Sequence, residues 1–261
     1  MLFLLSPAKS LDYETPLPKP LAHSQPALRE RSQALIAVLK EKSPQDIAQL
    51  MHLSDALADL NVARYQAWSP RFTANNSRQA AFAFNGDVYD GLDIRSLNPD
   101  DWAWAQNHLA ILSGLYGVLR PLDRMQAYRL EMGTALATEQ GKDLYQFWGA
   151  DIAQHLNQRL RSATPQGSAP IVVNLASQEY FKAVQKKVLQ AQVIDCVFED
   201  RKGDDYKIIS FFAKKARGLM VRYAIQNRLT EVEQLKGFDL AGYRYTQAAS
   251  TPHRLVFRRD P

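Results

Sequence analysis

The chain is organised around Leu109–Gly133, LAILSGLYGVLRPLDRMQAYRLEMG. Its first residues predict the end of a helix, because apolar residues recur from Trp102 at spacings of seven and three. Gly114 and Gly117 then interrupt the pattern. Two glycines this close predict a tight reversal, since glycine alone adopts positive φ without a Cβ clash. The apolar residues around them indicate a packed turn.

Arg120, Arg124 and Arg129 follow this turn, and Asp123 and Glu131 lie among them in the sequence. Backbone N–H groups exposed by glycine, beside guanidinium groups, suit contact with phosphate. The alternative is a buried corner whose arginines pair with carboxylates. The stretch by itself leaves both interpretations open.

Composition limits the class of protein. The chain has 261 residues, a formal net charge of +5 and a single cysteine, Cys196. An intramolecular disulfide and a cysteine-rich metal site are therefore excluded. The apolar run at the N-terminus is too short for a signal peptide, and no run approaches a membrane span. We expect a cytoplasmic protein without a membrane partner.

The order of elements predicts an α+β fold with a mixed sheet, an antiparallel hairpin and surrounding helices. Strands are expected at residues 1–5, 79–84, 171–175, 192–198, 206–211, 243–246 and 255–257. Helices are expected at residues 26–42, 44–51, 54–68, 100–112, 141–161, 178–187 and 213–229. Loop 164–170 is a candidate internal boundary, but its composition shift is slight, so we expect one domain over 1–261.

The expected helix at residues 213–229 has a basic face. That face contains Lys214, Lys215, Arg217, Gly218, Arg222 and Arg228, and no acidic residue lies within residues 207–229. A solvated helix face usually mixes charges of both signs, whereas a purely basic one suits phosphate contact. The alternative is an ordinary solvated face. Lys182, Lys186 and Lys187 extend the predicted phosphate-binding surface from the preceding helix.

A second candidate site lies at the ends of two buried strands. Ser6 and Lys9 follow the first, and Asn174 and Ser177 follow another. Strand ends of this kind converge into crevices in open α/β sheets. Lys9 would orient a phosphate there, or act as a base if desolvated. Structural turns at the strand ends explain the same residues equally well.

Several long motifs resemble the peroxide stress protein YaaA family over essentially the whole chain. They are LFLLSPAKSLDY (Leu2–Tyr13), AFNGDVYDGL (Ala83–Leu92), LSGLYGVLRPLD (Leu112–Asp123), YRLEMG (Tyr128–Gly133), GKDLYQFWG (Gly141–Gly149), VNLASQEYF (Val173–Phe181) and ISFFAKKARGLMVRY (Ile209–Tyr223). The resemblance implies a cytosolic protein that protects cells under hydrogen peroxide stress by limiting free iron and oxidative damage. It brings no established enzymatic reaction.

The segment Leu112–Asp123 is also similar to the helix-hairpin-helix module, which holds the DNA backbone through a glycine-flanked hairpin. That module usually reads Gly-apolar-Gly, whereas this chain has Leu115 and Tyr116 between its two glycines. The extra residue changes the expected hairpin geometry but keeps both glycines and the nearby arginines.

Two hypotheses follow. The first is a stress protein that binds the backbone of double-stranded DNA with weak sequence preference, through the basic helix and the glycine hairpin. The second is an enzyme acting on a phosphorylated or nucleoside-like molecule, in a crevice lined by Ser6, Lys9, Arg129, Asn174 and Ser177. Direct iron sequestration is disfavoured, because no His/Asp/Glu cluster has ligand spacing. We expect no metal or cofactor, and the sequence leaves the oligomeric state open.

Overall fold

The centre of the molecule is an eight-stranded sheet in this computed structural model, which describes residues 1–164 and 168–260. Its strands are β1 (Leu2–Leu5), β5 (Leu109–Ser113), β6 (Gly117–Leu119), β8 (Ile171–Asn174), β9 (Gln192–Lys202), β10 (Asp205–Lys207), β11 (Arg244–Tyr245) and β12 (Arg254–Arg259). They run in the order β11-β12-β9-β8-β1-β5-β6, and β10 pairs with β9. The strands β5, β1, β8, β9 and β12 are parallel to their neighbours within this set, and β6, β10 and β11 pair antiparallel. The expected mixed fold is confirmed.

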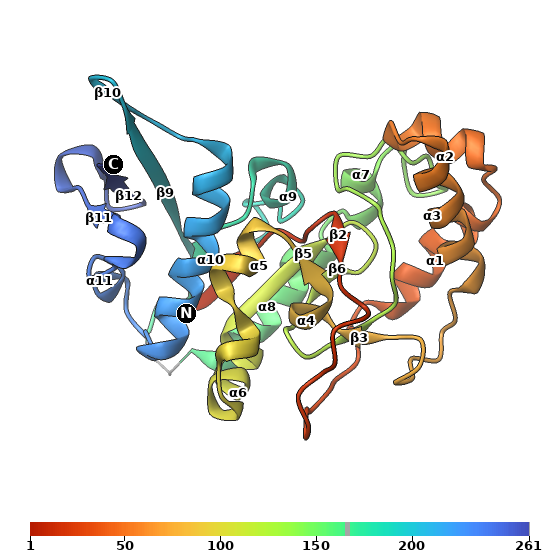
Figure 1. Cartoon of the computed structure of the whole chain (residues 1–261), viewed down its shortest axis with the longest axis horizontal. Helices are drawn as coiled ribbons and strands as arrows, with labels where there is room; N and C mark the ends of the chain where they lie inside the picture. The colour runs from red at the N-terminus through yellow and green to blue at the C-terminus, as the bar shows by residue number, and fades with distance from the viewer. Residues whose placement is uncertain (165–167, 261) are drawn as a thin grey trace.

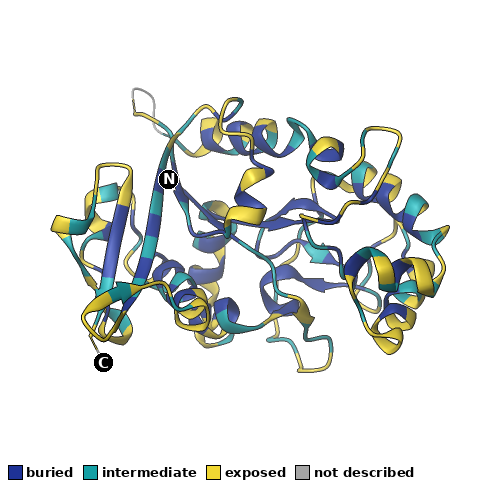
Figure 2. Ribbon diagram, turned by 90° about the horizontal axis from the view of Figure 1, so that it is seen from above, coloured by how far each residue is buried: buried dark blue, intermediate teal, exposed yellow. Residues whose placement is uncertain are grey.

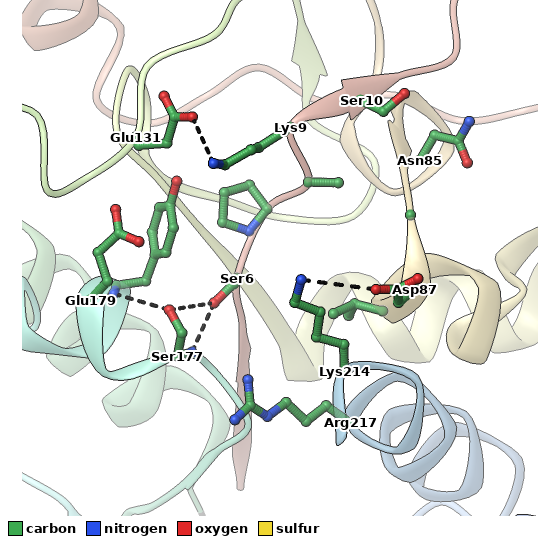
Figure 3. A pocket seen from close by; sticks show the side chains of 15 residues that line it. Ser6, Lys9, Ser10, Asn85, Asp87, Glu131, Ser177, Glu179, Lys214 and Arg217 are labelled. Atoms are coloured by element: carbon green, nitrogen blue, oxygen red, sulfur yellow. Dashed lines mark hydrogen bonds and ion pairs between the residues drawn. The ribbon is translucent and has the colours of Figure 1, made fainter. Parts of the chain in front are cut away.

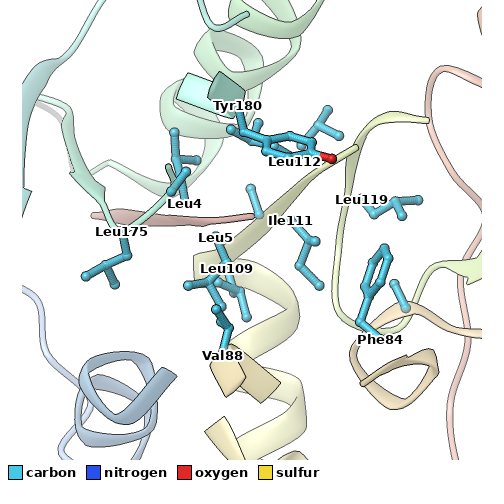
Figure 4. Packing of buried hydrophobic residues seen from close by; sticks show 14 of the residues in the cluster. Leu4, Leu5, Phe84, Val88, Leu109, Ile111, Leu112, Leu119, Leu175 and Tyr180 are labelled. Atoms are coloured by element: carbon cyan, nitrogen blue, oxygen red, sulfur yellow. The ribbon is translucent and has the colours of Figure 1, made fainter. Parts of the chain in front are cut away.

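The central strands form the core because their sequences are apolar on both faces. All four residues of β1 and all five of β5 are buried. Parallel strands covered on both faces typically read as continuous apolar runs rather than alternating ones. Leu4 and Leu5 pack in one cluster with Leu109 and Ile111 (Figure 4). These strands are buried along their length (Figure 2).

Helices cover this sheet, and a group of them forms one end of the molecule. They are α1 (Arg29–Lys40), α2 (Pro44–Met51), α3 (Asp55–Ala67), α4 (Ala80–Ala83), α5 (Asp87–Leu92), α6 (Pro99–His108), α7 (Leu144–Trp148), α8 (Asp151–Ala163), α9 (Gln178–Lys182), α10 (Ser210–Gln226) and α11 (Val232–Leu235). Helix α10 contacts α5, α6 and β1, whereas α1–α3 gather at the far end of the molecule (Figure 1). Short strands β2 (Ser10–Leu11) with β4 (Phe84–Asn85), and β3 (Arg78–Gln79) with β7 (Arg124–Met125), make two small ladders.

The stretch around Leu109 differs most from expectation. Helix α6 ends at His108, and Leu109–Ser113 forms β5 beside β1. Gly114–Tyr116 then turns the chain into β6, which pairs antiparallel with β5. The prediction of a helix-hairpin-helix turn was therefore wrong: the turn is a buried β-hairpin. A short apolar run suits a buried strand or a buried helix equally, and only its place beside β1 decides.

Other boundaries also differ. The helix expected at residues 178–187 ends at Lys182. A single strand was predicted at residues 79–84. The structure has the short helix α4 there, between the short strands β3 and β4. The helix expected at residues 141–161 divides into α7 and α8, because Gly149 adopts a φ of +45° between them. The strand expected at residues 206–211 stops at Lys207, and α10 begins at Ser210. The expected hairpin of β9 with β10 is present.

None of the helices in residues 1–164 and 168–260 is long and apolar enough to cross a bilayer. Of the expected boundary loop, residues 165–167 lie outside the described part of the chain.

Candidate functional site

A cavity of about 390 Å³ opens at the carboxyl ends of β1 and β8 (Figure 3). Ligands in open α/β sheets commonly bind where successive connections leave a strand in opposite directions. That holds here, because β5 lies on one side of β1 and β8 on the other. We call this cavity the crevice. Its polar lining residues are Ser6, Lys9, Ser10, Asn85, Asp87, Glu131, Ser177, Glu179, Tyr180, Lys214 and Arg217.

Ser6 and Ser177 join the two strand ends at the floor of the crevice. The backbone N–H of Ser177 donates to Ser6 Oγ at 2.9 Å, and the two hydroxyl oxygens lie 3.4 Å apart. Ser177 Oγ also accepts the N–H of Tyr180 and so caps α9, as the sequence predicts. Tyr89 donates its hydroxyl to the carbonyl of Ser6 at 3.1 Å. This network holds both strand ends in one fixed geometry.

Glu131 organises one wall of the crevice. Its Oε1 lies 3.4 Å from Lys9 Nζ and accepts from Arg129 Nε at 3.1 Å. Its Oε2 is buried, and no residue in the described part of the chain hydrogen-bonds to it. A buried carboxylate oxygen without a partner is costly unless water or a ligand satisfies it. Glu131 is therefore placed to accept a hydrogen bond from a bound molecule.

Helix α10 supplies the opposite wall. Lys214 Nζ lies 3.9 Å from Asp87 Oδ2, which belongs to the first turn of α5. Arg217 is half-buried, and burial lowers the pKa of its guanidinium group. Across residues 1–164 and 168–260, no carboxylate ion-pairs with Arg217. An uncompensated, partly desolvated guanidinium beside an open cavity favours an anionic ligand.

Gly218 sets the distance between this wall and the rest of the site. A Cβ on Gly218 would lie 1.8 Å from the Val88 carbonyl oxygen, and one on Gly91 would lie 2.1 Å from the Lys215 carbonyl oxygen. Helices α10 and α5 therefore cross with their backbones in contact. This crossing brings Lys214 to Asp87 and places Arg217 over the end of β1. Gly218 was predicted to leave backbone open to a phosphate, which was wrong because α5 covers it.

The structure brings together three of the five residues predicted for the crevice, namely Ser6, Lys9 and Ser177. Arg129 lies behind Glu131 and lines a small adjoining cavity. Asn174 does not line the crevice: its Nδ2 donates to Asp195 at 2.7 Å and its Oδ1 accepts from Ala176. Lys9 has 70% of its side chain exposed, so it is not a desolvated base.

The residues predicted to bind nucleic acid through the glycine hairpin do not form one surface. Gly114 and Gly117 are buried, because Leu130 covers the first and Trp148 the second. Arg120 donates to Asp123 and faces a cavity of about 730 Å³ near the amino ends of β1 and β5. Arg124 pairs through its backbone with Gln79 in the β3–β7 ladder.

The predicted basic face of α10 is likewise divided. Arg222 donates to the carbonyls of Leu92 and Asp93 and to Ser96 Oγ at 2.8–3.2 Å, so it caps the end of α5. Lys215 is exposed and follows Lys214 directly, but it does not line the crevice. Lys214, Lys215 and Arg217 thus remain as candidate phosphate contacts on this helix.

The three lysines at and after the end of α9 lie at the surface, and two of them have aromatic partners. The ammonium group of Lys182 sits 4.3 Å from the ring centroid of Tyr145, and that of Lys186 sits 5.2 Å from the ring of Phe181. Lys186 also lies 4.0 Å from Asp195. Lys187 is exposed. These three side chains remain accessible cations outside the crevice.

Sequence reasoning missed the acidic half of the site. Asp87, Glu131 and Glu179 all line the crevice beside the three cations. Glu179 Oε1 accepts the N–H of Gly133 at 2.9 Å, which ties α9 to the segment after β7. Asp87 begins α5, and only the fold places it across the crevice from Ser6 (Figure 3). Within the described chain, no three His, Cys, Asp or Glu side chains gather to hold a metal ion.

Residues 1–249 match the family model of the peroxide stress protein YaaA. The chain is 68% identical over 259 residues to a UPF0246 protein of Paracidovorax citrulli (strain AAC00-1), covering 99% of this chain and 98% of the relative. It is 66% identical, with the same coverage, to a UPF0246 protein of Polaromonas naphthalenivorans (strain CJ2). A UPF0246 protein of Leptothrix cholodnii is 61% identical over 261 residues, or 100% of this chain and 99% of the relative.

Proposed function

Because the chain belongs to the peroxide stress protein YaaA family, we propose that it protects the cell by binding nucleic-acid phosphates at the crevice. Lys9, Lys214 and Arg217 contact the phosphate groups, and the exposed Lys215 adds charge outside the cavity. The protein acts in the cytoplasm and binds the backbone of double-stranded DNA with weak sequence preference. Less free iron and less oxidative damage are the consequences of this activity.

The observation that carries this proposal is the position of Arg217. Its guanidinium group lacks a carboxylate partner among the described residues and lines an open cavity together with two lysines from separate segments. A phosphate group accepts charge-assisted hydrogen bonds from guanidinium and ammonium groups and would compensate the buried charge. Contacts of this kind position a backbone without reading its bases.

Fluorescence anisotropy of a labelled duplex over a salt series tests the proposal. Four phosphate contacts predict a log–log slope of about −3.6. The double variant Lys214→Ala/Arg217→Ala should reduce the magnitude of that slope by roughly two contacts' worth, equally for duplexes of different sequence.

Arg29→Ala/Arg71→Ala is the matched control, because it removes two exposed arginines from the distant end that holds α1 and α3. This control should keep the wild-type slope. The proposal is wrong if no duplex binds at low salt, if binding is independent of salt, or if both double variants behave alike.

A second candidate function is an enzyme that acts on a phosphorylated or nucleoside-like small molecule. The carboxylates of the crevice favour it, since Glu131 keeps an unsatisfied buried oxygen beside Lys9. A carboxylate and an ammonium group this close can exchange a proton with a bound substrate. Saturable binding of a nucleoside monophosphate, without duplex binding, would favour this candidate. A new ³¹P resonance that forms with wild-type protein but not with Glu131→Gln would establish turnover.

A further inference from the structure

Three large apolar side chains stand exposed around the start of α10. Ile208 and Phe211 are each 57% exposed, and Phe212 is 38% exposed. Two leucines of α3, Leu57 and Leu60, complete the set of exposed large apolar residues in the described chain. Isolated exposed apolar residues are ordinary, but neighbouring ones beside a polar cavity indicate a binding surface.

The two phenylalanines differ in how they are held. Arg259 lies 4.4 Å from the ring centroid of Phe212 and is itself paired with Asp200. Phe211 meets the ring of Phe212 edge-on, with centroids 5.5 Å apart and an interplanar angle of 65°. Phe212 is thus fixed by packing, and it supports Phe211 from one edge.

Phe211 lies next to the phosphate-contacting wall of the crevice. Residues three apart on a helix are surface neighbours, about 4.5 Å apart along the axis, so Phe211 adjoins Lys214. Phe211 and Gly218 are seven residues apart and share the helix face that packs on α5. Lys214 already reaches Asp87 in the first turn of α5, so Phe211 extends past the start of that helix. Phe211 is left 57% exposed there.

We propose that Phe211 stacks against an unpaired nucleobase whose adjoining phosphate is held by Lys214 and Arg217. This inference rests on the proposed function: duplex DNA binds through its phosphates alone, and a strand with unpaired nucleotides gains a stacked base in addition. The charge beside the ring supports this occupant over an apolar protein surface, because a phosphate and a base are covalently joined through one sugar. The bases of a duplex are stacked on both faces, so a duplex gains only the phosphate contacts.

Three labelled probes of equal length test the inference by anisotropy: a mixed-sequence single strand, an abasic strand and a duplex. The abasic strand keeps the phosphates and removes the bases. Stacking of one base on an aromatic side chain predicts that wild-type protein binds the normal strand about 5- to 150-fold more tightly than the abasic one. Phe211→Leu should abolish that difference and leave abasic binding unchanged, whereas Phe211→Trp should keep it.

Ile208→Ala is the matched control, because Ile208 is equally exposed but has no ring. Equal binding of the normal and abasic strands by wild-type protein overturns the inference and leaves phosphate binding intact. Failure of all three probes to bind at low salt overturns the proposed function itself. If Phe211→Leu instead removes a concentration-dependent dimer in sedimentation velocity while strand binding is unchanged, the surface serves self-association and the inference is wrong.

Discussion

The Cα of Gly218 lies so close to Val88 that a Cβ there would sit 1.8 Å from the Val88 carbonyl oxygen. We expect Gly218→Ala to lower the free energy of unfolding by about 2 kcal/mol or more, because α10 and α5 must separate. The gain in helix propensity, about 1 kcal/mol, does not offset this cost. Urea unfolding measures the change. Gln226→Ala, at an exposed position of the same helix, should stay within about 0.5 kcal/mol of wild type.

Gly117 requires glycine for a different reason. Its φ is +67°, and a Cβ would meet the Trp148 ring at 2.8 Å. Gly117→Val should therefore destabilise the protein by more than about 1 kcal/mol, from backbone strain and overpacking together. Lys9→Ala should leave the thermal midpoint nearly unchanged, because that side chain is mostly exposed. A Gly117→Val protein as stable as wild type would show that the hairpin can adopt another backbone conformation.

Ser6 links the ends of β1 and β8 at the floor of the crevice. Its removal should lower both the free energy of unfolding and the affinity for DNA. Ser6→Ala leaves the N–H of Ser177 without its acceptor, which should cost about 1–3 kcal/mol. The loosened strand ends should also weaken duplex binding. Ser10→Ala changes a hydroxyl of the same crevice that is exposed, and it should preserve stability. Equal unfolding curves for the two variants would count against a structural role for the Ser6–Ser177 contact.

His155 should make stability depend on pH. Burial lowers its pKa in the folded protein, and the charge of Arg159 lowers it further. The unfolded chain, with an ordinary histidine pKa of about 6.5, therefore binds a proton first as the pH falls. The stabilisation is complete above about pH 6.5 and is lost as the pH falls toward the lowered folded-state pKa. His155→Gln should flatten the fall in unfolding free energy between about pH 7.5 and 5. His23→Gln, at an exposed position, is the control, and an identical fall in all three proteins would contradict this.

We expect no stoichiometric iron in the protein. Within residues 1–164 and 168–260, no group of three potential ligand side chains is assembled. Anaerobic loading with ferrous iron, followed by desalting and elemental analysis, should leave far less than one iron per chain. Tight one-to-one iron would mean that the protein lowers free iron by holding it.

The candidate crevice shows which parts of a site local sequence can predict. Ser6 and Ser177 were recognisable because each follows a continuous apolar run that reads as a buried strand. Neighbouring parallel strands end at the same edge of a sheet, so polar residues after them converge. The carboxylates Asp87, Glu131 and Glu179 carry no such signal. They lie at the start of α5, in a segment without regular secondary structure and on α9, and the positions of these parts depend on contacts across the fold.

The sequence by itself determined the family, the mixed α/β class, most helices and the strands whose apolar runs are unambiguous, because these follow from local periodicity, caps and turn residues. Only the tertiary structure decided that Leu109–Ser113 is a strand, since a short apolar run takes its conformation from the neighbour it pairs with. The tertiary structure also decided which basic side chains of α10 are available to a ligand. Arg222 and Arg217 lie five residues apart on one helix, yet the first caps α5 and the second faces a cavity. Packing against α5 makes that distinction, and no spacing within α10 encodes it.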